Sequence, residues 1–351
     1  MLAIPASHRV LIFDEYNGPL EVRQFTVPEP EDDELLVKLE YSGICHSDLH
    51  AWCGDFAYAT VYPLIGGHEG AGRVVKMGAK VKDWKLGDMA GVKLVNANCL
   101  NCEYCKTGHE PLCDRIQNYG FDRHGTFQEY VTIRDVDTIK IPDGMNLAAA
   151  APVLCGGVTA YKALKETNVK AGQIVVITGA GGGLGSFGIQ YARAMGMRVV
   201  AVDHSSKKYH CEQLGAEWFV DGFETPDIAD HIRKITNGGP HGVVSFAASK
   251  KPMEQALEYI RKRGTVVLVG LPKDSKVNSI LVDTTSLIFN AITIKGSVIG
   301  SRLDTDEAMD FVARGAVKVP LEFVKLEDVP NVYEKMKEGQ VNSRVVVDFS
   351  L

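Results

Sequence analysis

The sequence lacks the features that would assign it to a membrane or to a nucleic acid. No apolar run approaches the roughly 18 residues that a bilayer-spanning helix needs. The first residues show neither a basic segment followed by a long apolar stretch nor an Arg/Ser-rich amphipathic extension. The formal net charge is −6 and no basic run offsets it, so neither nucleic acid nor a membrane is an expected partner. We therefore expect a cytoplasmic protein.

The composition is that of an ordinary globular protein. Hydrophobic residues make up 45% and charged residues 23% of the 351 residues, which is typical of folded soluble domains. A chain of this length is long enough for about two domains, each with its own core. The sequence has no low-complexity tract and no internal repeat. The sequence is therefore expected to contain two successive folding patterns.

The first pattern extends to about residue 156 and consists of short strand-like runs. Gly, Pro and Asp separate these runs, and the clearest of them lie at 34–43, 71–78, 89–95 and 127–133. Short strands with frequent turn residues are typical of sandwiches and barrels. This part of the sequence predicts a β-rich, barrel-like domain with long functional loops.

From residue 157 the pattern changes to six apolar runs, most of them separated by helical patterns such as 227–236 and 251–263. The runs lie at 173–178, 197–202, 217–221, 242–248, 265–270 and 292–298. This alternation predicts an α/β fold with a doubly wound parallel sheet that helices cover on both faces. We expect the remaining tail to fold back onto the first domain. The predicted domains are 1–156 with 297–351, and 157–296.

A glycine-rich turn joins the first two strands of the second domain. In the strict G-x-G-x-x-G register the first glycine is replaced by alanine, and the segment contains Gly179, Ala180, Gly181, Gly182, Gly183, Leu184 and Gly185. A flexible strand-to-helix turn would have a similar pattern. However, the next strand ends at Asp203, about 20 residues on, where a carboxylate accepts hydrogen bonds from an adenosine ribose and repels a 2′-phosphate. Loop and carboxylate together predict NAD binding rather than NADP binding.

Four of the eight cysteines lie within fifteen residues: Cys99, Cys102, Cys105 and Cys113. Disulfides are disfavoured in the expected reducing compartment. An iron–sulfur cluster is a second interpretation, but the fourth cysteine follows after seven residues and precedes aspartate, unlike the bacterial ferredoxin pattern. A closed site with four thiolates around a tetrahedral zinc ion fits best. Such a site would organise a loop that has no hydrophobic core of its own.

Three further candidates lie far apart in the sequence: Cys45, His68 and Cys155. Each cysteine is also compatible with a small buried side chain, and the histidine with a hydrogen-bonded core residue. Composition and spacing do not bring the three together.

Several motifs, in the same order, resemble those of the zinc-containing medium-chain alcohol dehydrogenases. They are Gly67-His68-Glu69 with Gly72, Gly78 and Val81, the stretch CHSDLHAW from Cys45, the four-cysteine segment, APVLCGG with Thr159, and GSV with Arg302. The resemblance extends from about residue 9 to the C-terminal strand. It is greatest for the tetrameric fungal enzymes, and it implies a GroES-like catalytic domain, a Rossmann domain, a homotetramer, two zinc ions per chain, and NAD.

The resemblance also implies a catalytic zinc held by Cys45, His68 and Cys155, with an open fourth position. Glu69 lies beside the zinc in this family, and Asp48 resembles the carboxylate that orients the histidine ligand.

By the same resemblance, the reaction is the reversible oxidation of a primary alcohol to an aldehyde. Ser47 is expected to pass the alcohol proton through the cofactor ribose to His50, whose residue type suits proton exchange near neutral pH.

Cofactor contacts are also implied by resemblance only. His46 and Arg344 resemble pyrophosphate contacts, and Lys208 resembles a ribose contact beside Asp203. Thr159 resembles the residue that packs on the nicotinamide. The nicotinamide amide is then expected to bind backbone groups of Val269, Ser297 and Ile299.

The substrate pocket departs from that of the ethanol-preferring fungal enzymes. Two tryptophans and a methionine there correspond to Phe56, Leu94 and Leu271 here. These replacements predict a wider pocket and a preference for longer, branched or aromatic alcohols, since each extra buried methylene is worth about 0.8 kcal/mol.

An NAD-dependent polyol dehydrogenase of the same superfamily is the alternative enzyme, whereas Asp203 argues against an NADPH-preferring cinnamyl-type reductase. A non-enzymatic NAD sensor, or a reductase without zinc, would be expected to have lost a zinc ligand or a relay residue, and all of these are present.

Overall fold

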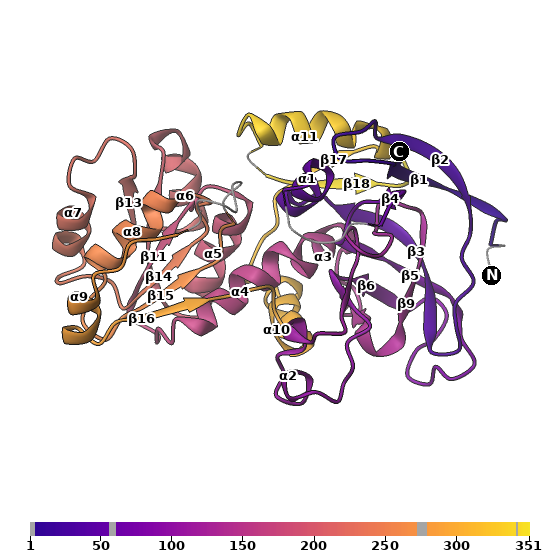
Figure 1. Cartoon of the computed structure of the whole chain (residues 1–351), viewed down its shortest axis with the longest axis horizontal. Helices are drawn as coiled ribbons and strands as arrows, with labels where there is room; N and C mark the ends of the chain where they lie inside the picture. Colours follow the sequence, from indigo (N-terminus) through magenta and orange to yellow (C-terminus); the bar gives the residue numbers. More distant parts are fainter. Residues whose placement is uncertain (1–3, 56–60, 272–278, 342) are drawn as a thin grey trace. The chain divides into compact units, whose positions relative to one another are not determined.

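The computed structural model describes residues 4–55, 61–271, 279–341 and 343–351. The chain divides into two compact units (Figure 1). The first unit comprises Met1–Val158, Gly300–Ala313 and Val319–Leu351, and the second comprises Thr159–Ile299 and Arg314–Lys318. The short segment Arg314–Lys318 therefore groups with the second unit although the residues on both sides of it belong to the first.

The second unit contains one six-stranded parallel sheet. Its spatial order is β13-β12-β11-β14-β15-β16, from β11 (Ile174–Thr178), β12 (Arg198–Asp203), β13 (Trp218–Asp221), β14 (Gly242–Ser245), β15 (Thr265–Leu268) and β16 (Thr293–Gly296). The chain leaves β11 in one direction through β12 and β13, and then returns to continue on its other side. This is the doubly wound arrangement in which a ligand binds where the strand order reverses.

Helices connect these strands and flank the sheet (Figure 1). They are most of α4 (Gly156–Glu166), α5 (Gly183–Ala194), α6 (Lys208–Leu214), α7 (Ile228–Ile235), α8 (Lys250–Tyr259) and α9 (Thr284–Phe289), with a 3-10 turn η4 (Ser205–Lys207). Asp227 and Asp283 begin α7 and α9 by accepting hydrogen bonds from backbone N–H groups of the first turn. The central strands β11 and β14 are buried along their whole length, as their continuous apolar sequence predicts. The predicted α/β fold is confirmed.

The first unit is built mainly from antiparallel strands. A seven-stranded sheet has the order β10-β6-β5-β3-β18-β17 with β9 also paired to β3, a second sheet has the order β2-β1-β4, and β7 pairs with β8. The strands are β1 (Ser7–Phe13), β2 (Glu21–Thr26), β3 (Glu34–Gly43), β4 (Leu64–Ile65), β5 (Gly70–Met77), β6 (Met89–Val92), β7 (Val95–Asn96), β8 (Gln117–Asn118), β9 (Tyr130–Arg134), β10 (Ile139–Lys140), β17 (Leu321–Val324) and β18 (Arg344–Asp348).

The C-terminal tail completes this unit. Strand β18 pairs antiparallel with β3, with Val346 opposite Gly43, and β17 adds to β18 in parallel. The helices of the first unit are α1 (His46–Cys53), α2 (Glu103–Lys106), α3 (Leu147–Ala150), α10 (Arg302–Ala313) and α11 (Val329–Lys337), with 3-10 turns η1 (Glu110–Leu112), η2 (Asp135–Asp137), η3 (Ala151–Leu154) and η6 (Leu326–Asp328).

One hydrophobic core of the first unit joins its two ends in sequence. Leu49 of α1 packs in the same cluster as Val10 and Ile12 of β1 and as Val329 and Tyr333 of α11. A buried aliphatic or aromatic side chain contributes about 1.5–3 kcal/mol relative to its exposed state. This core therefore fixes the position of α1, whose residues include several of the predicted site residues.

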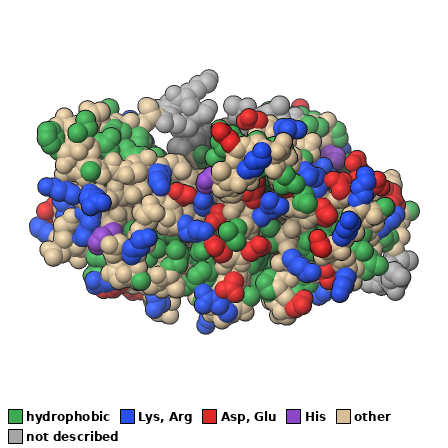
Figure 2. Space-filling model, turned by 90° about the horizontal axis from the view of Figure 1, so that it is seen from below, with side chains coloured by type: hydrophobic (Ala, Val, Ile, Leu, Met, Phe, Trp, Pro, Cys, Tyr) green, Lys and Arg blue, Asp and Glu red, His purple; other side chains and the backbone are tan. Residues whose placement is uncertain are grey.

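The surface carries charges of both signs. On the face shown in Figure 2, Lys and Arg side chains are interspersed with Asp and Glu side chains. In the described part of the chain, no single helix has both the length and the apolar composition needed to cross a membrane, and only the bent pair Leu147–Leu154 with Gly156–Glu166 meets both criteria when combined.

Candidate functional site

The structure brings Cys45, His68, Glu69 and Cys155 together in the first unit. Each residue offers one ligand atom, and these four atoms all lie within 4.8 Å of one another. Cys45 directly precedes α1, His68 and Glu69 lie between β4 and β5, and Cys155 follows η3. A tetrahedral zinc ion would hold sulfur and nitrogen ligands about 3.5–4 Å apart, so the group is compact enough for such an ion.

Asp48 connects two of these residues. Its Oδ2 accepts a hydrogen bond from the Cys45 backbone N–H at 2.8 Å, and its Oδ1 lies 2.7 Å from His68 Nδ1. The side chains of Asp48 and His68 are fully buried. A carboxylate only accepts, so Nδ1 carries the proton and Nε2 is left with a lone pair.

His68 Nε2 is buried and has no hydrogen-bond partner among the residues that the structure describes. A buried imidazole nitrogen normally has a partner, because leaving it unsatisfied costs about 1–3 kcal/mol. Two cysteine thiols and this nitrogen form the donor set that zinc prefers in proteins. The residues therefore fit a zinc ion.

The charges around the group also favour a cation. Burial would lower the pKa of His68, yet Asp48 and Cys45 raise it well above the ordinary value. The hydrogen bond from Cys155 lowers the pKa of the Cys45 thiol, while that contact and burial raise the pKa of Cys155. Cys45 is therefore the more easily ionised of the two thiols, and zinc binding would require both to lose their protons.

Glu69 forms a buried ion pair with Arg344. Its Oε1 accepts hydrogen bonds from Arg344 Nη2 at 2.6 Å and from the Gly156 backbone N–H at 3.3 Å. Burial raises the pKa of Glu69 to about 7, although Arg344 opposes this shift. Arg344, at the start of β18, was predicted to contact the cofactor pyrophosphate, and in the first unit its guanidinium faces Glu69.

The predicted relay residues, Ser47 and His50, lie on α1, where Ser47 is half-buried and His50 is buried. His46, which was predicted to contact the pyrophosphate, begins the same helix and is exposed. The His46 and His50 rings are 5.6 Å apart between centroids. His50 Nδ1 lies 2.7 Å from Oδ2 of Asp55, a residue that the sequence analysis did not single out. The signal available in the sequence was His-x3-Gly-Asp, in which a glycine ends the helix and turns the chain back.

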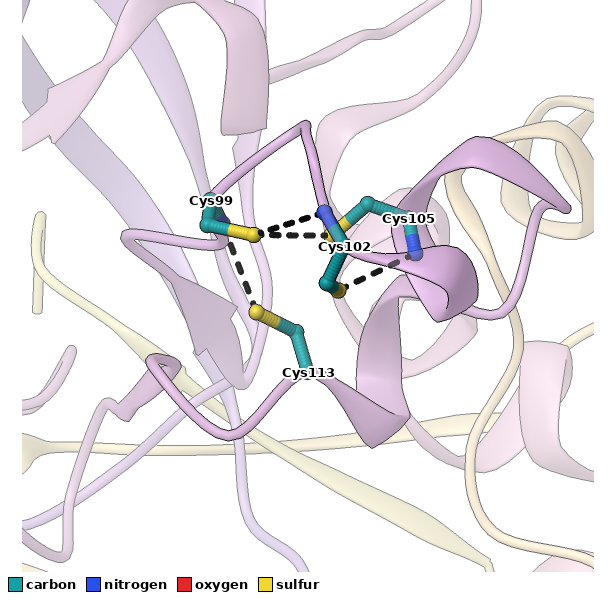
Figure 3. Close-up of side chains that lie close together, drawn as sticks. All are labelled: Cys99, Cys102, Cys105 and Cys113. Atoms are coloured by element: carbon teal, nitrogen blue, oxygen red, sulfur yellow. Dashed lines mark hydrogen bonds between the residues drawn. The ribbon is translucent and has the colours of Figure 1, made fainter.

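The four clustered cysteines form a second group, Cys99, Cys102, Cys105 and Cys113, and their sulfur atoms also lie within 4.8 Å of one another. Figure 3 shows the four side chains pointing toward a common centre from the loop after β7, from both ends of the first turn of α2, and from the residue after η1. No disulfide is formed, and all eight cysteines of the chain lie within the described residues as thiols.

Backbone N–H groups polarise this second group. Cys99 Sγ accepts from the N–H groups of Asn101 at 3.4 Å and Cys102 at 3.2 Å, and these contacts lower its pKa to about 6. Burial and the neighbouring thiols raise the pKa of Cys105 to about 12. One sulfur is thus readily ionised while another needs a metal ion to lose its proton.

In the second unit the glycine segment forms the turn between β11 and α5. Gly185 is packed so closely that a Cβ atom would lie 2.2 Å from the carbonyl oxygen of Gly179. Gly181 donates its N–H to Asp203 Oδ2 at 2.8 Å. The structure therefore brings the predicted ribose carboxylate to the predicted pyrophosphate loop, at the carboxyl end of the sheet.

The remaining cofactor candidates also lie in the second unit. Thr159 is buried, and Lys208 is exposed with Glu212 3.9 Å away. Lys207 is closer to the loop, because a Cβ on Gly181 would meet its side chain at 2.6 Å. Glycine at that position leaves room for this lysine.

Three candidates were predicted to hold the nicotinamide amide through their backbone. Val269 and Ser297 donate their N–H groups to Ser245 and Leu268, respectively, and Ile299 has a φ of 24°. The buried Ser297 Oγ has no partner among the described residues. A β-branched residue in this strained conformation is unusual, and such positions cluster at functional sites.

The three predicted pocket residues come from different parts of the chain. Phe56 lies outside the described residues. Leu94 is half-buried in the first unit, where its carbonyl accepts from Tyr119 N–H, and Leu271 is 56% exposed in the second unit.

Known proteins resemble this chain in sequence and in fold. The family model described as alcohol dehydrogenase GroES-like domain matches residues 31–143, and that described as zinc-binding dehydrogenase matches residues 183–314. Alcohol dehydrogenase 2 of Caenorhabditis elegans is 74% identical over 348 residues, which cover 99% of this chain and 98% of that protein.

Two solved structures are similar over nearly the whole chain. The alcohol dehydrogenase of the archaeon Aeropyrum pernix has a TM-score of 0.88 at 25% identity and covers 97% of this chain and 99% of its own. The acetophenone reductase of Geotrichum candidum, solved in complex with NAD, has a TM-score of 0.84 at 29% identity. The match covers 99% of this chain and 98% of that protein.

Proposed function

This chain belongs to the zinc-containing alcohol dehydrogenase family, and we propose that Cys45, His68 and Cys155 hold its catalytic zinc. The protein is an NAD-dependent alcohol dehydrogenase that interconverts alcohols and carbonyl compounds. The observation that supports the proposed ligand set most strongly is the buried, unpartnered His68 Nε2 beside the two cysteine sulfurs.

Zinc bound there supplies Lewis-acid chemistry that lowers the pKa of an alcohol hydroxyl, and NAD supplies the hydride acceptor. Asp48 holds His68 in the tautomer that binds metal through Nε2. Ser47 is proposed to take the substrate proton at its hydroxyl, and His50 to receive it and exchange it with solvent. Glu69 is proposed to lie beside the metal, where Arg344 balances its charge.

NAD binding is proposed to use the loop from Gly179 to Leu184 with Asp203. Further proposed contacts are His46, Thr159, Lys208, Val269, Ser297, Ile299 and Arg344. The preference for NAD over NADP rests on the Asp203 carboxylate, which already accepts a loop N–H and would repel a 2′-phosphate. Asp203→Ser is expected to weaken NAD binding and to raise the relative efficiency with NADP.

The second proposed ion is a structural zinc held by the four clustered cysteines, which makes two zinc ions per chain. Four thiolates leave no open coordination position, so this ion would take no part in the reaction. Metal analysis of the purified protein tests the number directly, since a single ion per chain would contradict one of the two sites.

For the substrate, we propose primary alcohols larger than ethanol. Phe56, Leu94 and Leu271 stand where ethanol-preferring relatives have two tryptophans and a methionine, so each side chain is smaller or differently shaped. Initial rates on the zinc-loaded protein, with NAD and with NADP, should be compared for ethanol, butanol, hexanol, a branched alcohol, benzyl alcohol and sorbitol. Highest efficiency with hexanol or benzyl alcohol is the expected result. Ethanol as the best substrate would contradict the wide pocket, and sorbitol would indicate a polyol dehydrogenase.

We also propose a homotetramer. Strand β16 ends the six-stranded sheet, and the segment around it exposes apolar side chains: Leu281, Ile288, Phe289 and Val298. An exposed sheet edge with apolar neighbours is normally covered by another chain. Sedimentation analysis is expected to give four chains per particle, and a monomer would contradict this. A cytoplasmic location is proposed because zinc–thiolate sites persist best in a reducing compartment.

A further inference from the structure

The contact between His50 and Asp55 goes beyond the roles that the family assigns to α1. We propose that Asp55 is a positioning residue for His50, which holds the imidazole in the tautomer that accepts a proton at Nε2. This inference rests on the proposed relay role of His50. It concerns which ring nitrogen of His50 accepts the proton, because the relay role alone does not specify the nitrogen.

The end of α1 places the two side chains together. Gly54 has a φ of 74°, and its N–H donates to the Ala51 carbonyl at 3.4 Å, while Asp55 N–H donates to the His50 carbonyl at 3.0 Å. This pair of hydrogen bonds is a Schellman ending, which turns the chain back over the last helical turn. The carboxylate then reaches His50 Nδ1 at 2.7 Å.

Glycine is required at this turn for two reasons. The left-handed backbone conformation is costly for other residues, and a Cβ atom on Gly54 would lie 2.7 Å from the Tyr16 ring. The helix itself is anchored just before the turn, because Trp52 Nε1 donates to the Gly18 carbonyl at 2.8 Å. The helix ending therefore brings the two residues of the His50–Asp55 pair close together through its backbone geometry.

The chemistry of the pair follows from the donor and acceptor inventory. An ionised carboxylate accepts and does not donate, so Asp55 keeps the proton of neutral His50 on Nδ1 and leaves the lone pair on Nε2. Without the carboxylate, the two tautomers would compete, and a proton could be accepted only by the molecules with Nε2 free. The His50 side chain is 8% exposed, so bulk water is a limited substitute for the carboxylate.

The same helix contains a second pair with the same arrangement. Asp48, near the start of α1, lies 2.7 Å from His68 Nδ1, just as Asp55, after its end, lies 2.7 Å from His50 Nδ1. In both pairs the carboxylate favours the tautomer with the proton on Nδ1, which suits Nε2 of His68 to bind a metal and Nε2 of His50 to accept a proton. The titratable ring of His46 also faces His50, at 5.6 Å between centroids.

The tautomer is measured directly by solid-state ¹⁵N NMR of the histidine-labelled, zinc- and NAD-loaded protein, with His50→Gln to assign the His50 signals. The variants are Asp55→Asn, which can donate to Nδ1 and favour the opposite tautomer, and Asp55→Glu, which keeps a carboxylate. Asp143→Asn, on an exposed turn, is the control for the change in charge. The wild type is expected to show a protonated Nδ1, and Asp55→Asn to show a protonated Nε2.

Kinetics provide the second readout. Asp55→Asn is expected to lower turnover at pH 7 by about tenfold or more, a fraction of the roughly 10²–10⁴-fold that acid–base catalysis contributes. The loss should shrink toward pH 10, because hydroxide then takes the proton directly. Asp55→Glu should recover part of the rate, and Asp55→Asn should cost nothing further in the His50→Gln background.

The outcomes separate this inference from the relay role itself. If His50→Gln leaves the turnover and its pH profile unchanged, the relay role fails, whatever Asp55 does. If His50→Gln is slow but Asp55→Asn keeps the wild-type tautomer and pH profile, the relay stands and the positioning role of Asp55 is wrong. A uniform loss at all pH values, with the tautomer unchanged, would also overturn it, because it would indicate a purely structural effect.

Discussion

The two candidate metal centres lie in the same unit but draw their ligands from very different lengths of chain. The four clustered cysteines come from one segment of fifteen residues, whereas Cys45, His68 and Cys155 come from three separate loops. In the four-cysteine centre the sulfurs contact mainly backbone N–H groups and one another. At the centre formed by Cys45, His68 and Cys155, packed strands and α1 hold the ligands.

The difference indicates opposite relations between metal and fold. The four-cysteine segment has only 3-10 and one-turn helices and few apolar contacts of its own, so a metal ion there would supply folding energy. The other centre is held by a hydrophobic core and by Asp48, so its fold should persist when the metal is lost. Loss of metal from the four-cysteine centre should therefore reduce the stability of the protein. Loss of metal from the centre of Cys45, His68 and Cys155 should reduce its activity.

The largest expected effect is on activity at the dispersed centre. Cys45→Ala removes a proposed zinc ligand, and kcat/KM is expected to fall by about 10⁴-fold or more, because the Lewis acid contributes several kcal/mol to the reaction. The metal content should drop by one ion per chain while the melting temperature changes little. Cys53→Ala, at the end of the helix that Cys45 precedes and outside both groups, serves as the control. Retained activity would contradict the ligand assignment.

Next in size is the effect on stability at the clustered centre. Cys113→Ala is expected to reduce the free energy of unfolding by about 3–5 kcal/mol, because loss of a structural metal belongs to the most destabilising class of change. The protein that remains folded should keep most of its kcat at low temperature. Calorimetry and zinc analysis measure both quantities. If Cys113→Ala were as stable as the wild type and its kcat were reduced as much as in Cys45→Ala, the two centres would not differ in their effects on stability and activity.

The third prediction concerns the carboxylate that supports the dispersed centre. Asp48→Asn keeps the size of the side chain but weakens its hold on Nδ1 of His68. The affinity for zinc is expected to fall by about 10–100-fold, as is typical when such a partner is changed. A chelator competition titration measures it, with the exposed Asp83→Asn as the control. Unchanged affinity would show that packing alone orients His68.

The smallest expected effect concerns the buried Lys93, whose charge interacts with that of Glu110 in the four-cysteine segment. Lys93 is 1% exposed, and burial lowers its pKa to about 8, while Glu110, Asp137 and Asp306 oppose this shift and Arg302 adds to it. The unfolded chain then binds more protons between pH 8 and pH 10.5, so stability rises with pH in that window, by at most about 1.4 kcal/mol per pH unit.

The contribution of Lys93 can be isolated with Lys93→Met, because the stability of this variant should not show the rise with pH that Lys93 causes. Denaturant unfolding of both proteins at several pH values from 7 to 10 measures the difference. Parallel stability curves for the two proteins would show that Lys93 does not titrate in this window. The result bears on the comparison because Glu110, which faces Lys93, ties the clustered segment to α10 through Arg302.

Local patterns in the sequence predicted much of the fold. The six apolar runs became the six strands of the parallel sheet. Nearly continuous burial of both faces selects Val, Ile and Ala along the central strands β12, β11 and β14. The helical patterns at 227–236 and 251–263 became α7 and α8, with ends displaced by a few residues where Asp227 caps one helix and α8 stops before Ile260. The clustered cysteines could be grouped for the same reason, since neighbours in sequence are close in space.

Other features depended on contacts that no local pattern encodes. Cys45, His68 and Cys155 were grouped only by resemblance to a family, because their proximity results from strand pairing and core packing over more than a hundred residues. The pairing of Glu69 with Arg344 joins the first fifth of the chain to its last strand, across 275 positions in the sequence. Asp55 lies only five residues from His50, yet its contact appears only once Gly54 adopts its left-handed conformation.

The sequence by itself therefore determined the elements, the class of each domain and the closed cysteine group, because these depend on side-chain periodicity and on short loops. The tertiary structure decided which distant side chains share a buried space, which nitrogen of His68 is left for a metal, and which carboxylate faces His50. The physical reason is burial, because a polar group that is removed from water must pair with a group that the folded chain places beside it.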